Sequence, residues 1–104
     1  MKSEEWKVLL DDEPDNELVH FSYAKALMDE RQWLPAATEF QKLLELDPEY
    51  IIAWAFQARC YLEAGEHDKA RYAAEKGLPL ARAFNHEVPI EEIESILEEL
   101  DSEF

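Results

Sequence analysis

The sequence has little positive charge, little glycine and a single cysteine. Ten Lys and Arg stand against 25 Asp and Glu, which gives a formal net charge of −15. A surface of that sign repels the phosphates of nucleic acids and the headgroups of anionic lipids, so neither nucleic acid nor a membrane is an expected partner. Cys60 alone cannot form a disulfide within the chain, and its neighbours are typical of a helix interior, so we expect a buried and unreactive thiol.

Long apolar runs and the motifs of catalysis are also missing. No stretch reaches the ~18 apolar residues that a membrane span needs, and the first residues contain no apolar leader segment, so a cytoplasmic location is expected. His20, His67 and His86 share no helical face and have no cysteine nearby. Neither a metal site nor a cofactor is therefore predicted. Without a phosphate-binding loop or a nucleophile beside a base, the chain is not expected to be an enzyme.

What is present favours a single all-α domain. A chain of 104 residues has room for one core and little more, and its apolar content of 47% is enough to fill that core. Long stretches consist of Ala, Leu, Glu, Gln, Lys and Arg, which lose the least free energy on entering a helix.

Two prolines define a period. Pro14 and Pro48 each follow an acidic residue, and their separation is 48 − 14 = 34 residues, which prompts a search for repeats of that length. Residues 5–14 and 39–48 then share one amphipathic pattern that ends in the same stop signal. The period therefore belongs to a structural unit as well as to the prolines.

The same offset aligns residues 17–50 with residues 51–84. Small residues recur in step in the two copies, where close helix packing needs them: Ala24 matches Ala58, and Ala36 matches Ala70. The predicted helices are residues 3–12, 16–30, 33–46, 49–64, 67–83 and 89–101. Gly65 lies where a helix end needs a positive φ, and Pro79 is expected to kink or end the fifth helix because it removes a hydrogen bond to the carbonyl of Glu75.

In this register the sequence resembles the tetratricopeptide repeat family, whose pattern is Trp-x2-Leu-Gly-x2-Tyr on helix A, then Ala-x3-Phe and a late Pro on helix B. The second copy supplies Trp54, Ala58, Tyr61, Gly65 and Ala70, and the first copy supplies Ala24, Leu27, Ala36, Phe40 and Pro48. The departures are Gln57, Ala74 and Arg82 in the second copy, and His20 and Tyr23 in the first. His20, at the Trp position, is expected to be a packed ring and not a ligand.

The resemblance implies antiparallel helix pairs stacked as a short right-handed solenoid of about six helices. Residues 1–104 would form one domain: a half-repeat helix in 1–14, repeats in 17–50 and 51–84, and a capping helix with an acidic tail in 85–104. The expected cap has Ile90, Ile93, Leu97 and Leu100 on one face and glutamates on the other, as the end of a solenoid requires.

The resemblance also implies that helix A lines a concave inner face. The positions that it assigns to this face are Leu18, Phe21, Lys25, Met28 and Asp29 in the first repeat, and Ile52, Ala55, Arg59, Leu62 and Glu63 in the second. Both helices are apolar on more than one stripe, so they need cover on two sides. That cover is either the chain's own core and end helix or a partner, and the sequence leaves both open.

Lys25 and Arg59 stand at equivalent positions one repeat apart in a chain with few cations. Together they could hold an acidic group of a partner, or each could pair with a carboxylate four residues on, Asp29 or Glu63. The family's clamp for chaperone tails is not predicted, because Phe21 and Ala55 occupy the position where that clamp needs a basic or amide side chain.

The predicted function is a protein–protein interaction module that binds a peptide or protein segment on the inner face, without bond chemistry. The alternative is a self-associating module, in which two copies bury the same stripe against each other as a homodimer.

Overall fold

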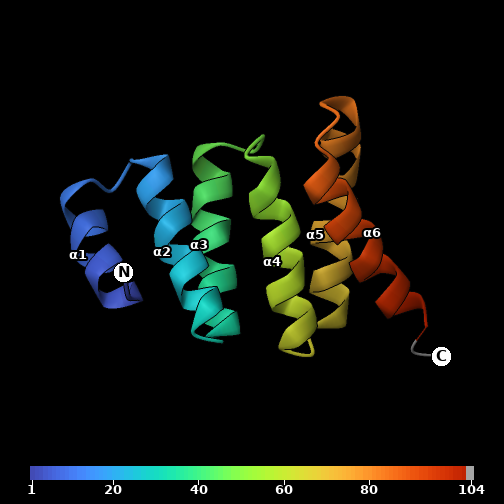
Figure 1. The fold of residues 1–104 in the computed structure, drawn as a ribbon, viewed down its shortest axis with the longest axis horizontal. Helices are drawn as coiled ribbons and strands as arrows, with labels where there is room; N and C mark the ends of the chain where they lie inside the picture. Colours follow the sequence, from blue (N-terminus) through green and yellow to red (C-terminus); the bar gives the residue numbers. More distant parts are fainter. Residues whose placement is uncertain (103–104) are drawn as a thin grey trace.

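The computed structural model describes residues 1–102, and this part of the chain contains α-helices and no strand. The helices are α1 (Ser3–Asp12), α2 (Glu17–Asp29), α3 (Trp33–Leu46), α4 (Ile51–Glu63), α5 (His67–Ala83) and α6 (Glu87–Asp101). They follow one another in chain order along the long axis, with α1 at one end and α6 at the other (Figure 1). The predicted all-α class with six helices is confirmed, and no helix in residues 1–102 is long and apolar enough to cross a membrane.

Several helix boundaries differ from the predicted ranges by one or two residues, and α4, for example, begins at Ile51 instead of residue 49. The last helix begins at Glu87, two residues before the predicted start, because Pro89 fits the first turn, where its missing N–H breaks no helical bond. The fifth helix does not end at Pro79 but continues to Ala83. Glu75 and Pro79 are both exposed, so the carbonyl that loses its hydrogen bond can be hydrated.

Consecutive helices pack against each other, and α6 contacts both α5 and α4. The small residues that recur at the repeat period sit at these contacts. Ala24, Ala36, Ala58 and Ala70 all have 0% exposure, which is what a position needs when the neighbouring helix comes too close for a larger side chain.

The core has two parts that meet at α4. The first cluster joins α2, α3 and α4 around Phe40 and Leu43. The second joins α4, α5 and α6 around Ile93 and Ile96. Because α4 contributes to both clusters, its apolar residues are used on two sides.

The repeat extends to individual hydrogen bonds. Trp54 Nε1 donates to the carbonyl of Pro48 at 2.8 Å, and His20 Nε2 lies 2.6 Å from the carbonyl of Pro14. The two pairs are 34 residues apart, so they occupy equivalent positions in the two repeats. The imidazole of His20, with its proton on Nε2, therefore makes the same bond as the indole of Trp54. His20 is 7% exposed, which agrees with the packed ring expected from the sequence.

The turns between helices A and B also repeat. Glu66 N–H donates to the carbonyl of Tyr61 at 2.8 Å, and Gln32 N–H donates to that of Leu27 at 2.9 Å. Both are closing bonds of helix C-terminal turns. In each turn, the residue just before the donor of this bond has a positive φ. The angle is 80° at Gly65 and 60° at its counterpart Arg31. The first repeat thus holds an arginine in a conformation that favours glycine.

Cys60 lies on α4 inside the first cluster with 0% exposure. Burial is the main cause that raises the pKa of its thiol to about 12, with a smaller effect from the charge of Glu63. The thiolate, which is the reactive form, is therefore suppressed, as the sequence predicted.

Gly77 offers a test of how closely α4 and α5 pack. A Cβ added there would lie 2.6 Å from the Cβ of Trp54 and 3.1 Å from Cδ1 of Ile93. Overpacking typically costs about 1–3 kcal/mol, against the ~1 kcal/mol that alanine gains over glycine in a helix. Gly77→Ala should therefore lower the free energy of unfolding in urea titrations, while Ser95→Ala, at an exposed position of α6, should not. Equal or higher stability of Gly77→Ala would contradict the close contact.

Candidate functional site

Among the predicted inner-face residues of α2, Phe21 belongs to an aromatic cluster that connects α2 to α4. The ring of Phe21 lies 5.6 Å from that of Tyr50 and 6.0 Å from that of Phe56, centroid to centroid. Phe21 and Met28 are half-buried against the first cluster. Leu18, one turn before, is 66% exposed. These contacts place α2 and α4 side by side, and we call the surface formed by Leu18, Phe21, Lys25, Met28, Ile52, Arg59 and Leu62 the α2–α4 face.

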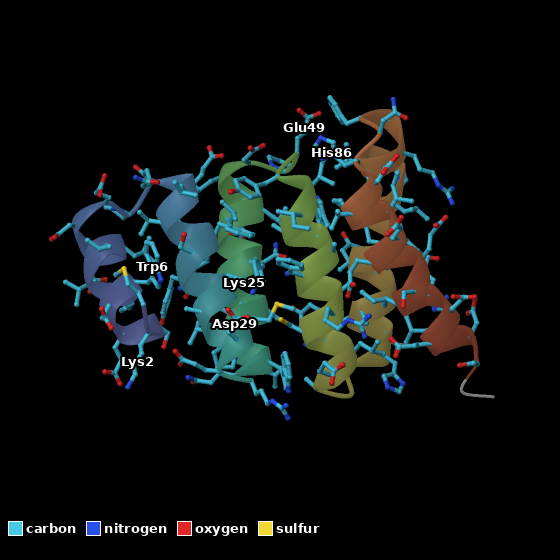
Figure 2. The ribbon with its side chains drawn as sticks, in the orientation of Figure 1. Lys2, Trp6, Lys25, Asp29, Glu49 and His86 are labelled. Carbon is cyan, nitrogen blue, oxygen red and sulfur yellow. The ribbon has the colours of Figure 1, made fainter. Side chains whose placement is uncertain are left out.

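A hollow of about 280 Å³ opens beside Phe21, between α1 and α2. Trp6 of α1 forms one wall, and Phe21, Lys25 and Asp29 contribute from α2. Figure 2 shows Trp6 in the space between α1 and α2, and Lys25 and Asp29 next to each other on α2. Trp6 is not among the predicted site residues, because its helix was interpreted only as a cap. The sequence did contain a signal for Trp6. When α1 is interpreted as a lone helix B, its aromatic residue is expected beside the first inner helix.

Lys25 contacts both its own helix and α4. Its Nζ lies 2.6 Å from Oδ1 of Asp29 and 5.8 Å from the centroid of the Phe56 ring. The pairing at four residues' distance, one of the two readings of the sequence, is thus the one formed. The carboxylate and the ring face together satisfy the ammonium group.

Arg59 is engaged more fully, mainly by α6. Its Nε lies 2.6 Å from Glu92, one Nη lies 2.8 Å from Glu99, and Glu63 is 3.6 Å away. Burial disfavours the charged guanidinium, but the hydrogen bonds that it donates to Glu92 and Glu99 outweigh this effect and raise the pKa of Arg59. The sequence predicted the pairing with Glu63 as an alternative but not the two carboxylates from α6.

Three other predicted inner-face residues of α4 lie in or against the second core cluster. Ala55 is completely buried within this cluster, and Ile52 and Leu62 are half-buried against it. Because Ile93 and Ile96 of α6 belong to the same cluster, the end helix covers part of the stripe that the sequence left open. The structure therefore separates the predicted positions: Phe21, Lys25 and Asp29 of α2 border the hollow. On α4, Ile52, Ala55 and Leu62 lie at the cluster shared with α6, and Arg59 pairs with α6 directly.

Two carboxylates meet at the other end of the α2–α4 face. Glu17 begins α2, and Asp47 caps α3, where its Oδ1 accepts the N–H of Glu49 at 3.0 Å. Loss of hydration, a hydrogen bond to Asp47 and the charge of Asp47 raise the pKa of Glu17 above its ordinary value of 4.5. Burial and the charges of Glu17 and Asp47 likewise raise the pKa of the neighbouring Tyr50.

The comparisons with known proteins agree with this architecture. None of the known family models matches the sequence. A TPR repeat-containing protein of Pseudomonas aeruginosa is 31% identical over 87 residues, which cover 84% of this chain and 83% of that protein. This chain belongs to the tetratricopeptide repeat family.

Solved structures show the same TPR fold. A protein of Bordetella parapertussis, solved in solution, superposes with a TM-score of 0.82 at 27% identity, over 97% of this chain and 88% of that one. The TPR2B domain of yeast Sti1, in complex with pHsp70, has a TM-score of 0.87 at 16% identity and covers 98% of this chain and 82% of its own. The first TPR of Spaghetti (RPAP3), bound to the HSP90 peptide SRMEEVD, has a TM-score of 0.80 at 18% identity, over 96% of this chain and 78% of that one.

The attachment of α1, which forms one wall of the hollow, depends on a carboxylate. Ser3 N–H donates to Oε2 of Glu30 at 2.8 Å, and Ser3 Oγ donates to Oε1 at 2.7 Å. These two bonds, the backbone bond first, lower the pKa of Glu30 from 4.5. A lowered pKa means that the bonds stabilise the fold above pH 4.5 and that this stabilisation is lost as the pH falls through the folded-state pKa.

We expect Ser3→Ala to speed hydrogen exchange of the α1 amides at pH 7. The difference from the unmodified chain should shrink below the folded-state pKa of Glu30, where its carboxylate is protonated in both proteins. Ser95→Ala serves as the control. A difference that does not change with pH would show that the bond from Ser3 Oγ to the Glu30 carboxylate does not hold α1.

Arg59→Met tests the link between α4 and α6. It keeps the apolar stem but removes hydrogen bonds to charged groups, so the free energy of unfolding should fall by about 1–3 kcal/mol, with faster exchange of the α6 amides. Arg82→Met is the matched control, because Arg82 also pairs with α6, at Glu94, but both side chains are at least 49% exposed. Such exposed pairs contribute about 0–1 kcal/mol. Equal effects of the two substitutions would contradict a special role for Arg59.

Proposed function

We propose that this TPR protein is an interaction module that binds a peptide or protein segment on its α2–α4 face. The observation that carries the proposal is an exposed Leu18 one helical turn before Phe21, which lines a hollow together with Trp6. Leu18 is 66% exposed, and a large exposed apolar side chain on the same helix as an aromatic-lined hollow can anchor a partner's side chain.

The TPR neighbours support this mode of binding. The Sti1 domain is in complex with pHsp70, and the Spaghetti domain is bound to an HSP90 peptide. Domains of this shape therefore accept segments of other proteins, although fold alone does not name the partner. The HSP90 peptide carries the acidic residues EEVD, whereas in this chain Lys25 and Arg59 are already paired with carboxylates. The proposed partner therefore differs in chemistry from that peptide.

The burial of some predicted residues reduces the set of contacts that we propose for a partner. Ala55 has no exposed area, so it acts as a spacer and not as a contact. The proposed contacts are Leu18, Phe21 and Met28 of α2, together with the accessible parts of Ile52 and Leu62, next to the hollow at Trp6. A segment of several residues, extended or helical, fits such a row of apolar positions.

Substitution of Leu18 tests the proposal. Peptides selected from a random library displayed on phage against the folded chain should bind the Leu18→Glu variant about tenfold or more weakly, because a buried anchor is worth over 1 kcal/mol. Leu34→Glu is the matched control: Leu34 is the second residue of α3 as Leu18 is of α2, and it is 47% exposed. Isothermal titration calorimetry measures both, with circular dichroism as the check on folding. Absence of binders, or equal binding to the two variants, would overturn the proposal.

Light scattering after size exclusion separates this function from self-association. An isolated chain of 12.2 kDa should elute as a monomer if the face is kept for another protein. A stable species of ~24 kDa that Leu18→Glu dissociates would instead favour the homodimer.

A further inference from the structure

The α2–α4 face has no free cation among the residues described. Lys25 is 2.6 Å from Asp29, and Arg59 lies within 4.0 Å of Glu63, Glu92 and Glu99. Each positive charge is already matched, and around Arg59 three carboxylates surround one guanidinium. The face therefore has an excess of negative charge at its α6 side.

The opposite end of the face is also acidic. Glu17 precedes Phe21 by one helical turn on the same stripe of α2. The Phe21 ring stacks on Tyr50, whose N–H donates to the carbonyl of Asp47 at 3.1 Å, so Asp47 lies at the same end of the face. Loss of hydration and, after it, the neighbouring Asp47 carboxyl raise the pKa of Glu17, and like charges oppose each other's ionisation. A cation placed beside them would remove that repulsion.

Between these two acidic ends the face is largely apolar, apart from Lys25 and its partner Asp29. Leu18 is exposed, and Phe21, Met28, Ile52 and Leu62 are half-buried. The order along the face is thus carboxylates, apolar row, carboxylates. This arrangement is complementary to a segment that has apolar side chains in its middle and positive charges toward both ends.

We propose that the occupant of the α2–α4 face is a basic, amphipathic segment of another protein. Its apolar residues would pack on Leu18, Phe21 and Met28, and its Lys or Arg side chains would pair with Glu17 and Asp47 at one end and with Glu99 and Glu63 at the other. The inference rests on the proposed function and adds the chemistry of the partner to it. It also gives the net charge of −15 a role, because a field of that sign speeds the approach of basic segments and repels acidic ones.

The first test is the composition of the selected peptides. Peptides that lose affinity on Leu18→Glu should be enriched in Lys and Arg as well as in apolar residues, compared with the unselected library. If such peptides are neutral or acidic, the basic partner is overturned and the binding function stands. If no selected peptide responds to Leu18→Glu, the function itself fails. The two failures are thus distinguishable.

The second test removes the charge of the face. Glu17→Gln combined with Asp47→Asn keeps side-chain size, and the new Asn retains an oxygen for the N–H of Glu49. This double variant should bind a selected basic peptide about tenfold more weakly, because truncating close charge pairs at an interface costs more than 1 kcal/mol. The affinity should also fall less steeply between low and high salt.

The control changes net charge equally but elsewhere. Glu45→Gln with Glu75→Gln alters two exposed carboxylates on α3 and α5, outside the α2–α4 face. It should change affinity only slightly, through the long-range field, at physiological salt. Equal losses in the two double variants would show that overall charge alone attracts the peptide, and would overturn the assignment of Glu17 and Asp47. The same peptide with Gln in place of its Lys and Arg should bind the unmodified chain no more tightly than it binds the Glu17→Gln, Asp47→Asn variant.

Discussion

The close approach of neighbouring helices at small residues is the constraint on which the rest of the structure depends. Where Ala24, Ala36, Ala58 and Ala70 are completely buried, there is no room for a longer side chain. Short interhelical distances allow each helix pair to stack directly on the next. The larger apolar residues of α2 and α4 therefore lie between the helix pairs or on the α2–α4 face. The α2–α4 face is a consequence of this packing.

The same constraint explains why α4 contributes buried residues to both core clusters. It lies between both core clusters, and even its polar Gln57 is 2% exposed, with its amide donating to the carbonyl of Ala37 at 3.3 Å and to Gln41 at 3.0 Å. A buried amide is tolerated because it is hydrogen-bonded. The α2 side of the face, by contrast, has only the short α1 beyond it, and there the hollow remains.

Much of the fold could be predicted from the sequence because its signals are local or periodic. The 34-residue spacing of prolines and alanines located the repeats, and Gly65 marked a turn whose φ is 80°. The matching turn at Arg31 follows from the repeat offset, but the positive φ of this residue does not follow from its type. Its φ of 60° is imposed by the repeat, which overrides the residue's own preference. Likewise, periodicity showed that Pro79 interrupts a hydrogen bond but not that packing on both sides keeps the helix continuous.

The candidate site was predictable only in part, because its decisive contacts join distant residues. The positions on α2 and α4 followed from the repeat register, but the partners of Arg59 lie 33 and 40 residues away on α6. No spacing rule connects them. The hollow at Trp6 depends similarly on how α1 packs on α2.

The burial of Cys60 determines how the protein responds to oxidants. With 0% exposure and a pKa raised to about 12, the sole thiol of the folded chain is neither accessible nor ionised. Two molecules can therefore be joined through sulfur only after α4 has left its core. A covalent dimer that forms under oxidising conditions records the fraction of chains that have opened, and not a native assembly.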